Sequence, residues 1–256
     1  MLAIAREMGQ SESAFVFPSD QADFSVRFFM PVGEIPLAGH PTIATIHALR
    51  EIGRIGGERT SVTLQMPAGI IPVAIEQIAE GGTRFAMSQP EPVFLSQRKR
   101  GPIADALGLK KKDLLDGVLP QVVSTGSPQL QIALSSLAAL DRISVDRRLL
   151  FPPARDFLSV HVFARSDDGF ALHARHFADI GDILEDAFTG SATGGMAAYC
   201  ARYGIVDAAE YRVAQGMHVK RAGIADVRVG GSPPDAIGRI TVCGEAITVL
   251  RGTLSF

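Results

Sequence analysis

The chain has 256 residues, 46% of them hydrophobic, which is enough for one large globular domain or for two of about 120 residues each. The formal net charge is −2 and the lysines and arginines are dispersed, which argues against a nucleic-acid-binding surface. No apolar run approaches the roughly 18 residues that a membrane span needs, and the N-terminus lacks a basic-then-apolar secretion signal. We therefore expect a cytoplasmic protein with neither nucleic acid nor membrane as a partner.

Neither of the two cysteines suggests redox or metal chemistry. Cys200 and Cys243 form no Cys-x-x-Cys motif, and both fall inside apolar segments, so buried free thiols are expected. The six histidines are scattered along the chain. His173 and His176 lie three residues apart on a predicted strand and would face opposite sides of it. The sequence therefore predicts no metal site.

The first half of the chain is predicted to be rich in strands. A helix over residues 1–8 ends at Gly9, and a second helix runs from Thr42 to Gly53. Alternating or β-branched segments predict strands at 14–17, 26–30, 62–66, 70–75 and 84–88. Because the chain opens within a helix that has no preceding element to pack on, we expect that the sequence starts late.

The second half follows a connection at 93–120 that carries a short helix near 103–107. Strands are predicted at 121–124, 129–133, 158–164, 171–177, 211–214, 224–230, 239–243 and 245–250, with helices at 136–141 and after Thr193. Each half combines many strands with a single helix that follows a glycine turn. This predicts an α+β fold of two similar domains, 1–100 and 101–256, each a curled sheet around a central helix, with the last strand able to return to the first domain.

Two turn-and-helix segments match without a gap. Glu34–Thr42 aligns with Glu185–Thr193, and each helix then ends on a glycine, Gly53 and Gly204, in a position that favours a left-handed cap. One interpretation is chance similarity of two such units. The other is that two related domains each contribute one helix N-terminus to a shared cleft. Free N–H groups and the helix dipole at such an end suit a carboxylate or a phosphate.

The residues that could carry chemistry lie near these turns. Glu12 sits in a Ser-Glu-Ser loop, His40 and Ser191 occupy equivalent places at the two helix starts, and Asp186 precedes the second glycine turn. Each also has an ordinary structural role open to it. Glu12 could be an exposed loop carboxylate, and His40 could pack against or cap its helix. Asp186 could compensate charge at the helix N-terminus, and Ser191 could be an N-cap. Together, an acid and a base near two anion-binding helix ends suit proton abstraction next to an anionic group.

Three blocks resemble one family. Together they are similar to the phenazine-biosynthesis PhzF-like family and occur in the order found there. The blocks are Ile4-Ala-Arg-Glu-Met with Ser11-Glu-Ser, the segment from Phe29 to Thr42, and Glu185–Gly194. The resemblance covers nearly the whole chain. It implies the diaminopimelate-epimerase-like fold, in which two α+β domains, each a β-barrel-like sheet wrapped around a helix, flank the active site. It also implies a homodimer and no metal or organic cofactor.

The resemblance also implies roles for individual residues. In the phenazine enzyme, a glutamate moves a proton between carbons of trans-2,3-dihydro-3-hydroxyanthranilate. Glu12 matches that acid–base, and His40 and Asp186 match the other two active-site side chains. Other matching positions hold the substrate, a small carboxylate, and these are Ser11, Gly39, Gly190 and Ser191. A partly buried Glu12 with a raised pKa would then act near neutral pH.

The sequence also departs from the family pattern. Members normally begin with a strand and a Gly-Asn-Pro turn ahead of the first helix, so we expect either an upstream start or a truncated copy. The segment Gln215–Arg221 lacks the expected Gly-Arg-Pro-Ser. Two-base epimerases of this fold place a cysteine before each turn glycine, whereas this chain has Ala38 and Thr189, which excludes a thiol pair.

Three functions remain open from the sequence. The first is a cofactor-independent isomerase with Glu12 as its acid–base. The second is a non-catalytic relative that binds a small carboxylate. The third, phosphate-ester binding at the helix ends, is weaker because neither turn carries a Gly-Lys-Ser/Thr motif or a Gly-x-Gly-x-x-Gly motif.

Overall fold

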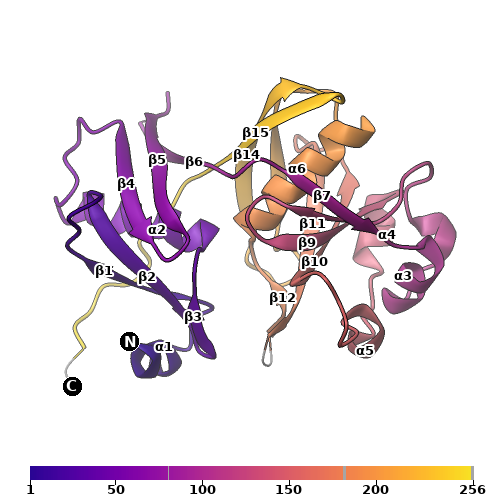
Figure 1. The fold of residues 1–256 in the computed structure, drawn as a ribbon, viewed down its shortest axis with the longest axis horizontal. Helices are drawn as coiled ribbons and strands as arrows, with labels where there is room; N and C mark the ends of the chain where they lie inside the picture. The colour runs from indigo at the N-terminus through magenta and orange to yellow at the C-terminus, as the bar shows by residue number, and fades with distance from the viewer. Residues whose placement is uncertain (80, 181–182, 255–256) are drawn as a thin grey trace. The chain divides into compact units, whose positions relative to one another are not determined.

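The computed structural model describes residues 1–79, 81–180 and 183–254 (Figure 1). The chain divides into two compact units, one of Met1–Met87 with Cys243–Phe256 and one of Ser88–Val242. Both are built from many strands and few helices, which is a mixed α/β architecture. The domain boundary predicted between residues 100 and 101 stays a prediction. None of the described helices is both long and apolar enough to cross a bilayer.

The first unit is a small sheet packed on one helix. Its elements are α1 (Leu2–Met8), β1 (Ser13–Phe17), β2 (Phe24–Met30), β3 (Gly33–Ile35), α2 (Gly39–Glu51), β4 (Ser61–Met66), β5 (Gly69–Gln77) and β6 (Thr83–Ser88). The strand order is β1-β2-β4-β5-β6, with β3 paired to β2. Ile46 of α2 and Phe28, Leu64 and Phe85 of the strands are fully buried together. Burial of these side chains holds α2 against the sheet.

The second unit is larger. Its strands are β7 (Val93–Gln97), β8 (Gln121–Ser124), β9 (Pro128–Leu134), β10 (Ser159–Arg165), β11 (Leu172–Ile180), β12 (Ile183–Asp186), β13 (Glu210–Gln215), β14 (Gly223–Ser232) and β15 (Ala236–Gly244). Its helices are α3 (Arg100–Ala106), a 3₁₀ turn (Lys111–Asp113), α4 (Leu137–Asp141), α5 (Arg147–Leu150) and α6 (Gly190–Tyr203). The order is β15-β14-β13-β11-β10-β9-β8-β7, with β12 on β11.

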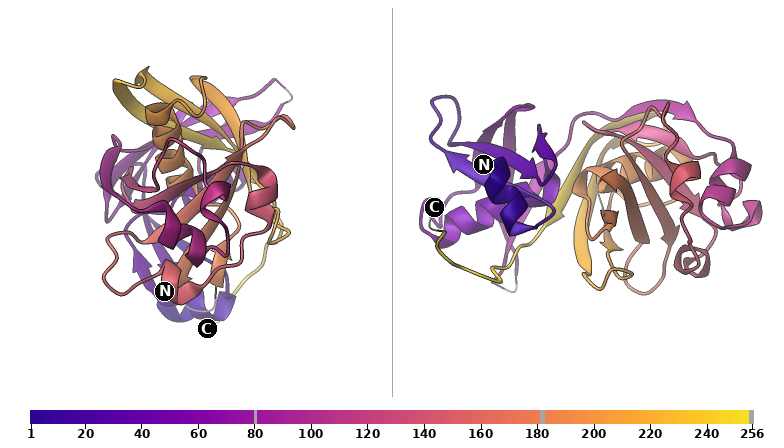
Figure 2. Two further views of the ribbon diagram at one scale, coloured as in Figure 1. Left: turned by 90° about the vertical axis from the view of Figure 1, so that its right-hand side faces the viewer. Right: turned by 90° about the horizontal axis from the view of Figure 1, so that it is seen from below.

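The sheet of the second unit has a core on each face. Successive residues of a strand point to opposite sides, so Val162 packs with α3, α4 and α5 while Phe163 packs with α6. In Figure 2 the strands of this unit curve around α6. Eleven of the fourteen residues of α6 are buried, so this helix is the buried central helix of the second unit. The first turn of α6 is therefore placed by contacts on many sides.

The matched turn segments share their local structure as well as their sequence. Glu34 of β3 is paired with Arg27 at 2.5 Å, and Glu185 of β12 is paired with Arg175 at 2.7 Å. Each arginine also lies over the ring two residues further along its strand, at 5.2 Å in the first unit and 5.1 Å in the second. Phe29 faces Glu34 across the ladder just as Phe177 faces Glu185. This shared strand–strand–helix pattern argues against chance similarity.

Most predicted elements are confirmed within a few residues, but the segment 245–250 is not a strand. Ile247 and Val249 are 82% and 88% exposed and belong to no ladder, and a strand needs a hydrogen-bonding neighbour. Arg251 instead pairs with Glu51 of α2 at 2.8 Å. The short strands β3, β7 and β12 fall in segments where no strand is predicted from the sequence.

Two local predictions are confirmed at the ends of elements. Gly9, Gly53 and Gly204 each adopt a positive φ, at 61°, 73° and 62°, where α1, α2 and α6 end. Cys200 and Cys243 are both buried and are not joined in a disulfide, as predicted. Burial raises the pKa of Cys200, so that thiol stays protonated.

Candidate functional site

The first unit brings Glu12 and His40 together. Glu12 directly precedes β1, and His40 is the second residue of α2. Their closest atoms, Oε2 of Glu12 and Nε2 of His40, lie 3.1 Å apart. The Glu12 side chain is 16% exposed, against 39% for His40, so the carboxylate is the more deeply placed partner. The structure thus joins two of the three residues predicted to be catalytic.

The predicted raised pKa of Glu12 is wrong. Burial does raise the pKa of this carboxyl, and it is the largest single influence. The imidazole of His40, through its hydrogen bond and its charge, and the hydroxyl of Ser11 together outweigh burial, so the pKa of Glu12 lies below its ordinary value of 4.5. Glu12 is therefore an ionised carboxylate near neutral pH, ready to accept a proton.

Helix α2 begins three residues earlier than predicted, at Gly39 instead of Thr42. Pro41 lies within its first turn, where a missing N–H costs no helical hydrogen bond. The N-cap residue, Ala38, provides no side-chain cap. The first N–H groups of α2 thus lack the side-chain acceptor usual at a helix start, and they lie beside His40.

The second unit places Asp186 just ahead of α6. Asp186 ends β12, and its carboxylate accepts a hydrogen bond from the hydroxyl of Thr189. Gln215 at the end of β13 holds both sides of this turn, because its amide donates to the Asp186 carbonyl at 3.0 Å and accepts from the Thr189 N–H at 3.2 Å. Gly216 packs so closely that an added Cβ would lie 2.4 Å from the Ala187 carbonyl oxygen. The turn is therefore tightly fixed.

Helix α6 opens in the same way as α2. It begins at Gly190, and its N-cap residue, Thr189, makes no side-chain cap hydrogen bond. Ser191, the second residue, accepts a hydrogen bond from the Gln129 amide at 2.9 Å. Ala38 and Thr189 therefore occupy equivalent N-cap positions, and neither can supply the thiolate that a cysteine would.

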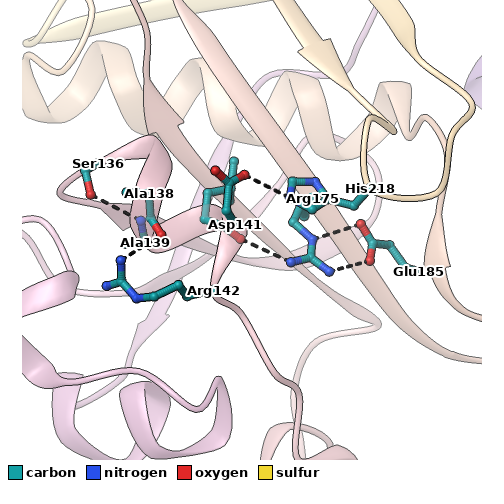
Figure 3. Close-up of polar contacts among 9 residues, drawn as sticks. Ser136, Ala138, Ala139, Asp141, Arg142, Arg175, Glu185 and His218 are labelled. Carbon is teal, nitrogen blue, oxygen red and sulfur yellow. Dashed lines mark hydrogen bonds and ion pairs between the residues drawn. The ribbon is translucent and has the colours of Figure 1, made fainter.

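The segment Gln215–Arg221, where the sequence departs from the family pattern, contacts α4 through His218 (Figure 3). His218 lies 3.0 Å from the carboxylate of Asp141, at the end of α4. In the same region Arg175 donates to the Leu140 carbonyl at 3.1 Å and pairs with Glu185. These contacts link α4 to the strand that carries Asp186.

The structure thus groups the predicted site residues into two sets. Ser11, Glu12, Gly39 and His40 belong to the first unit, and Asp186, Gly190 and Ser191 to the second. Within the described ranges, no group of three or more His, Cys, Asp or Glu side chains could hold a metal ion.

The comparisons with known proteins decide the family. The model of the phenazine biosynthesis-like protein family matches residues 1–252. The chain belongs to this family. A trans-2,3-dihydro-3-hydroxyanthranilate isomerase of Pseudomonas chlororaphis is 31% identical over 257 residues, 99% of this chain and 87% of that protein. An uncharacterised isomerase of Clostridium acetobutylicum is 31% identical over an alignment of 268 residues, gaps included. The alignment covers 99% of this chain and 87% of that protein.

Solved structures of the phenazine biosynthesis-like family agree with this assignment. A PhzF family protein of Bacillus anthracis superposes with a TM-score of 0.84 at 30% identity, over 95% of this chain and 84% of that one. A hydroxyproline epimerase of Agrobacterium vitis, at 12% identity and a TM-score of 0.58 over 91% of this chain and 71% of that one, shares the fold alone. The chain is thus an isomerase of the phenazine biosynthesis-like family.

Replacing His40 by glutamine is expected to move the acid limb of the kcat/KM profile to higher pH. The variant can still offer an amide N–H but loses the imidazole's charge, which opposes burial, so the pKa of Glu12 rises. The measurement is the pH dependence of kcat/KM for the isomerisation of trans-2,3-dihydro-3-hydroxyanthranilate. His47→Gln is the matched control, because His47 also lies on α2 but is 3.6 Å from Glu51. An unchanged acid limb in His40→Gln would show that His40 does not control Glu12.

Proposed function

We propose that this chain is a cofactor-independent isomerase that moves a proton on a small cyclic or unsaturated amino or carboxylic acid, with Glu12 as its acid–base. The observation that carries the proposal is the half-buried Glu12 carboxylate, kept ionised by the adjacent His40 and Ser11. A carboxylate in that state is a general base of the kind that proton abstraction from carbon requires. The names of relatives such as the Pseudomonas chlororaphis enzyme point to the same class of reaction.

The proposed reaction conserves atoms and electrons. Glu12 takes a proton from a carbon next to the unsaturated system, and the electron pair of that C–H bond moves into the conjugated system. The same carboxyl then returns a proton to another carbon of the system, so that the double bonds shift and nothing is oxidised. Glu12 thus ends in its starting state, ready for the next cycle.

The remaining residues are proposed to bind and orient the substrate. The uncapped first turns at Gly39 and at Gly190 with Ser191 would attract its carboxylate. His40 and Asp186 would hold its other polar groups and assist proton transfer, and Ser11 would assist Glu12. The proposal extends to the finer fold, with two similar barrel-like domains as in the epimerases, and to a homodimer in the cytoplasm.

The test of this function is proton exchange on a defined compound. Incubation of the protein with trans-2,3-dihydro-3-hydroxyanthranilate in D₂O should give isomerisation, followed by proton NMR, with deuterium entering the carbon that Glu12 reprotonates. A panel of cyclic amino acids and carboxylates should reveal any other substrate by the same exchange. Binding without exchange for every compound would instead support the non-catalytic carboxylate-binding relative.

A further inference from the structure

A cluster of buried polar side chains lies behind the first turn of α6. Gln89 follows β6, Thr125 follows β8, and Gln129 and Gln131 are on β9. All four are buried, with exposures of 3%, 2%, 3% and 0%. Each contacts one of the first three residues of α6, or a side chain that does. The cluster is thus organised around the start of this helix.

The contacts run to successive residues of the turn. Gln89 donates to the Gly190 carbonyl at 2.8 Å, and Thr125 lies 3.3 Å from the Ser191 carbonyl. Gln131 reaches the Ala192 carbonyl at 3.5 Å, the long limit of a hydrogen bond. The Thr125 hydroxyl also donates to the Gln89 amide oxygen at 2.5 Å, which orients that amide.

Two glycines make room for these amides. An added Cβ at Gly194 would lie 1.9 Å from the Gln89 amide oxygen, and one at Gly195 would lie 2.6 Å from the Gln131 amide nitrogen. Real Cβ atoms do not approach other atoms so closely, so any larger residue would displace the amides. The inner face of α6 and the cluster therefore fit each other.

Packing alone does not explain this arrangement. The amide oxygens of Gln129 and Gln131 are buried and have no hydrogen-bond partner among the residues that the structure describes. Apolar side chains would fill the same space without the cost of burying unpaired polar atoms. The first-turn carbonyls also need no second donor, because the helix itself supplies one. The contacts that these side chains make to the first turn of α6, and not the full pairing of their own polar atoms, therefore explain the arrangement.

The chemistry of these contacts prepares the turn for an anion. A hydrogen bond to the Gly190 carbonyl polarises the peptide that ends in the Ser191 N–H and makes that N–H a stronger donor. Gln129 donates to the Ser191 oxygen, and an amide NH₂ cannot accept a hydrogen bond, so the serine's own proton must go elsewhere. Ser191 is only half-buried, so a ligand can reach it.

We propose that Gln129 is a positioning residue that directs the Ser191 hydroxyl toward the substrate carboxylate, while Gln89, oriented by Thr125, strengthens the Ser191 N–H as a donor to the same group. The inference rests on the proposed function, because it assigns the carboxylate to this turn. Gln129 touches Ser191 and acts through it.

The test compares two ligands that differ by a carboxylate, 3-hydroxyanthranilate and 2-aminophenol, by titration calorimetry. Gln129→Met keeps the volume but removes the donor, and it should weaken 3-hydroxyanthranilate binding about 10-fold while leaving 2-aminophenol unchanged. Gln121→Met is the matched control. Gln121 is a buried glutamine that contacts the far end of α6, at the Tyr203 hydroxyl, and its loss should change neither affinity.

A double-mutant cycle then tests the route through the serine. In a Ser191→Ala background, Gln129→Met should have no further effect, because its target hydroxyl is gone. Additive losses, or equal losses for both ligands, would overturn the inference. If Gln129→Met does not fold, Thr125→Val should still weaken 3-hydroxyanthranilate selectively, by about threefold, and an unchanged affinity would overturn it. Wild-type protein that binds both ligands equally would instead reject the carboxylate site itself, and with it the proposed function.

Discussion

Replacing Glu12 by glutamine is expected to lower kcat by about 10³-fold, because an amide cannot take a proton from carbon. Glutamine keeps the size of the side chain and can still contact His40. Binding of 3-hydroxyanthranilate should therefore change little, and the free energy of unfolding by no more than about 1 kcal/mol. The measurements are single-turnover isomerisation, calorimetric binding and urea unfolding of the same preparation.

A matched control separates loss of the base from loss of a carboxylate in general. Glu76→Gln removes another partly buried acid of the first unit, one that faces Arg84 across the ladder between β5 and β6. This variant should isomerise at the wild-type rate. Wild-type turnover by Glu12→Gln would remove Glu12 from the mechanism, whereas equal losses in both variants would point to general damage to the first unit.

The sequence predicted best what depends on neighbours along the chain. The glycine turns, the two helices that follow them and the closing glycines Gly53 and Gly204 all rest on local backbone preferences. The start of α2 was misplaced because Gly39-His-Pro41 resembles a turn, although proline is well tolerated in a first helical turn. Such errors are small because they stay within one element.

Predictions that depend on neighbours in space were poorer. The pKa of Glu12 was predicted from burial alone, and the opposing contact with His40 depends on the placement of β1 against α2. Gln129 was missed because a glutamine in an alternating strand usually faces solvent. On β9, Gln129 lies on the same side of the strand as Ala133, which packs against α6, and this brings its amide to Ser191. The residues that support a site are therefore harder to predict than those that form it.

A pair of buried histidines that was not predicted from the sequence lies in the interior of the second unit. His161 and His176 are 15 residues apart but face each other across β10 and β11, with their Nδ1 atoms 3.2 Å apart. Burial lowers the pKa of both rings, that of His176 to about 3 and that of His161 well below 6.5, where the neighbouring ring adds to the effect. Both imidazoles are therefore neutral in the folded protein at neutral pH.

The pair is expected to make the protein sensitive to mild acid. Below pH 6.5 the unfolded chain binds a proton at each histidine and the folded chain binds none, so the free energy of unfolding falls as the pH falls. Each histidine approaches a slope of about 1.4 kcal/mol per pH unit only well below pH 6.5, so both together remove up to about 3 kcal/mol between pH 6.5 and 5.0. That is a large part of the stability of an ordinary domain.

Urea unfolding of the second unit between pH 7.5 and 5.0 should show this slope, and NMR should find both rings neutral in the folded protein at pH 5. The matched variant is His161→Ala with His176→Phe, because Ala14 and Phe28 face each other at the equivalent place in the first unit. Its free energy of unfolding should depend little on pH down to pH 5. Below pH 5 the carboxyl groups begin to titrate. A slope as steep as that of the wild-type protein would show that other groups bind these protons. A flat profile would show that the acid sensitivity originates in this buried pair.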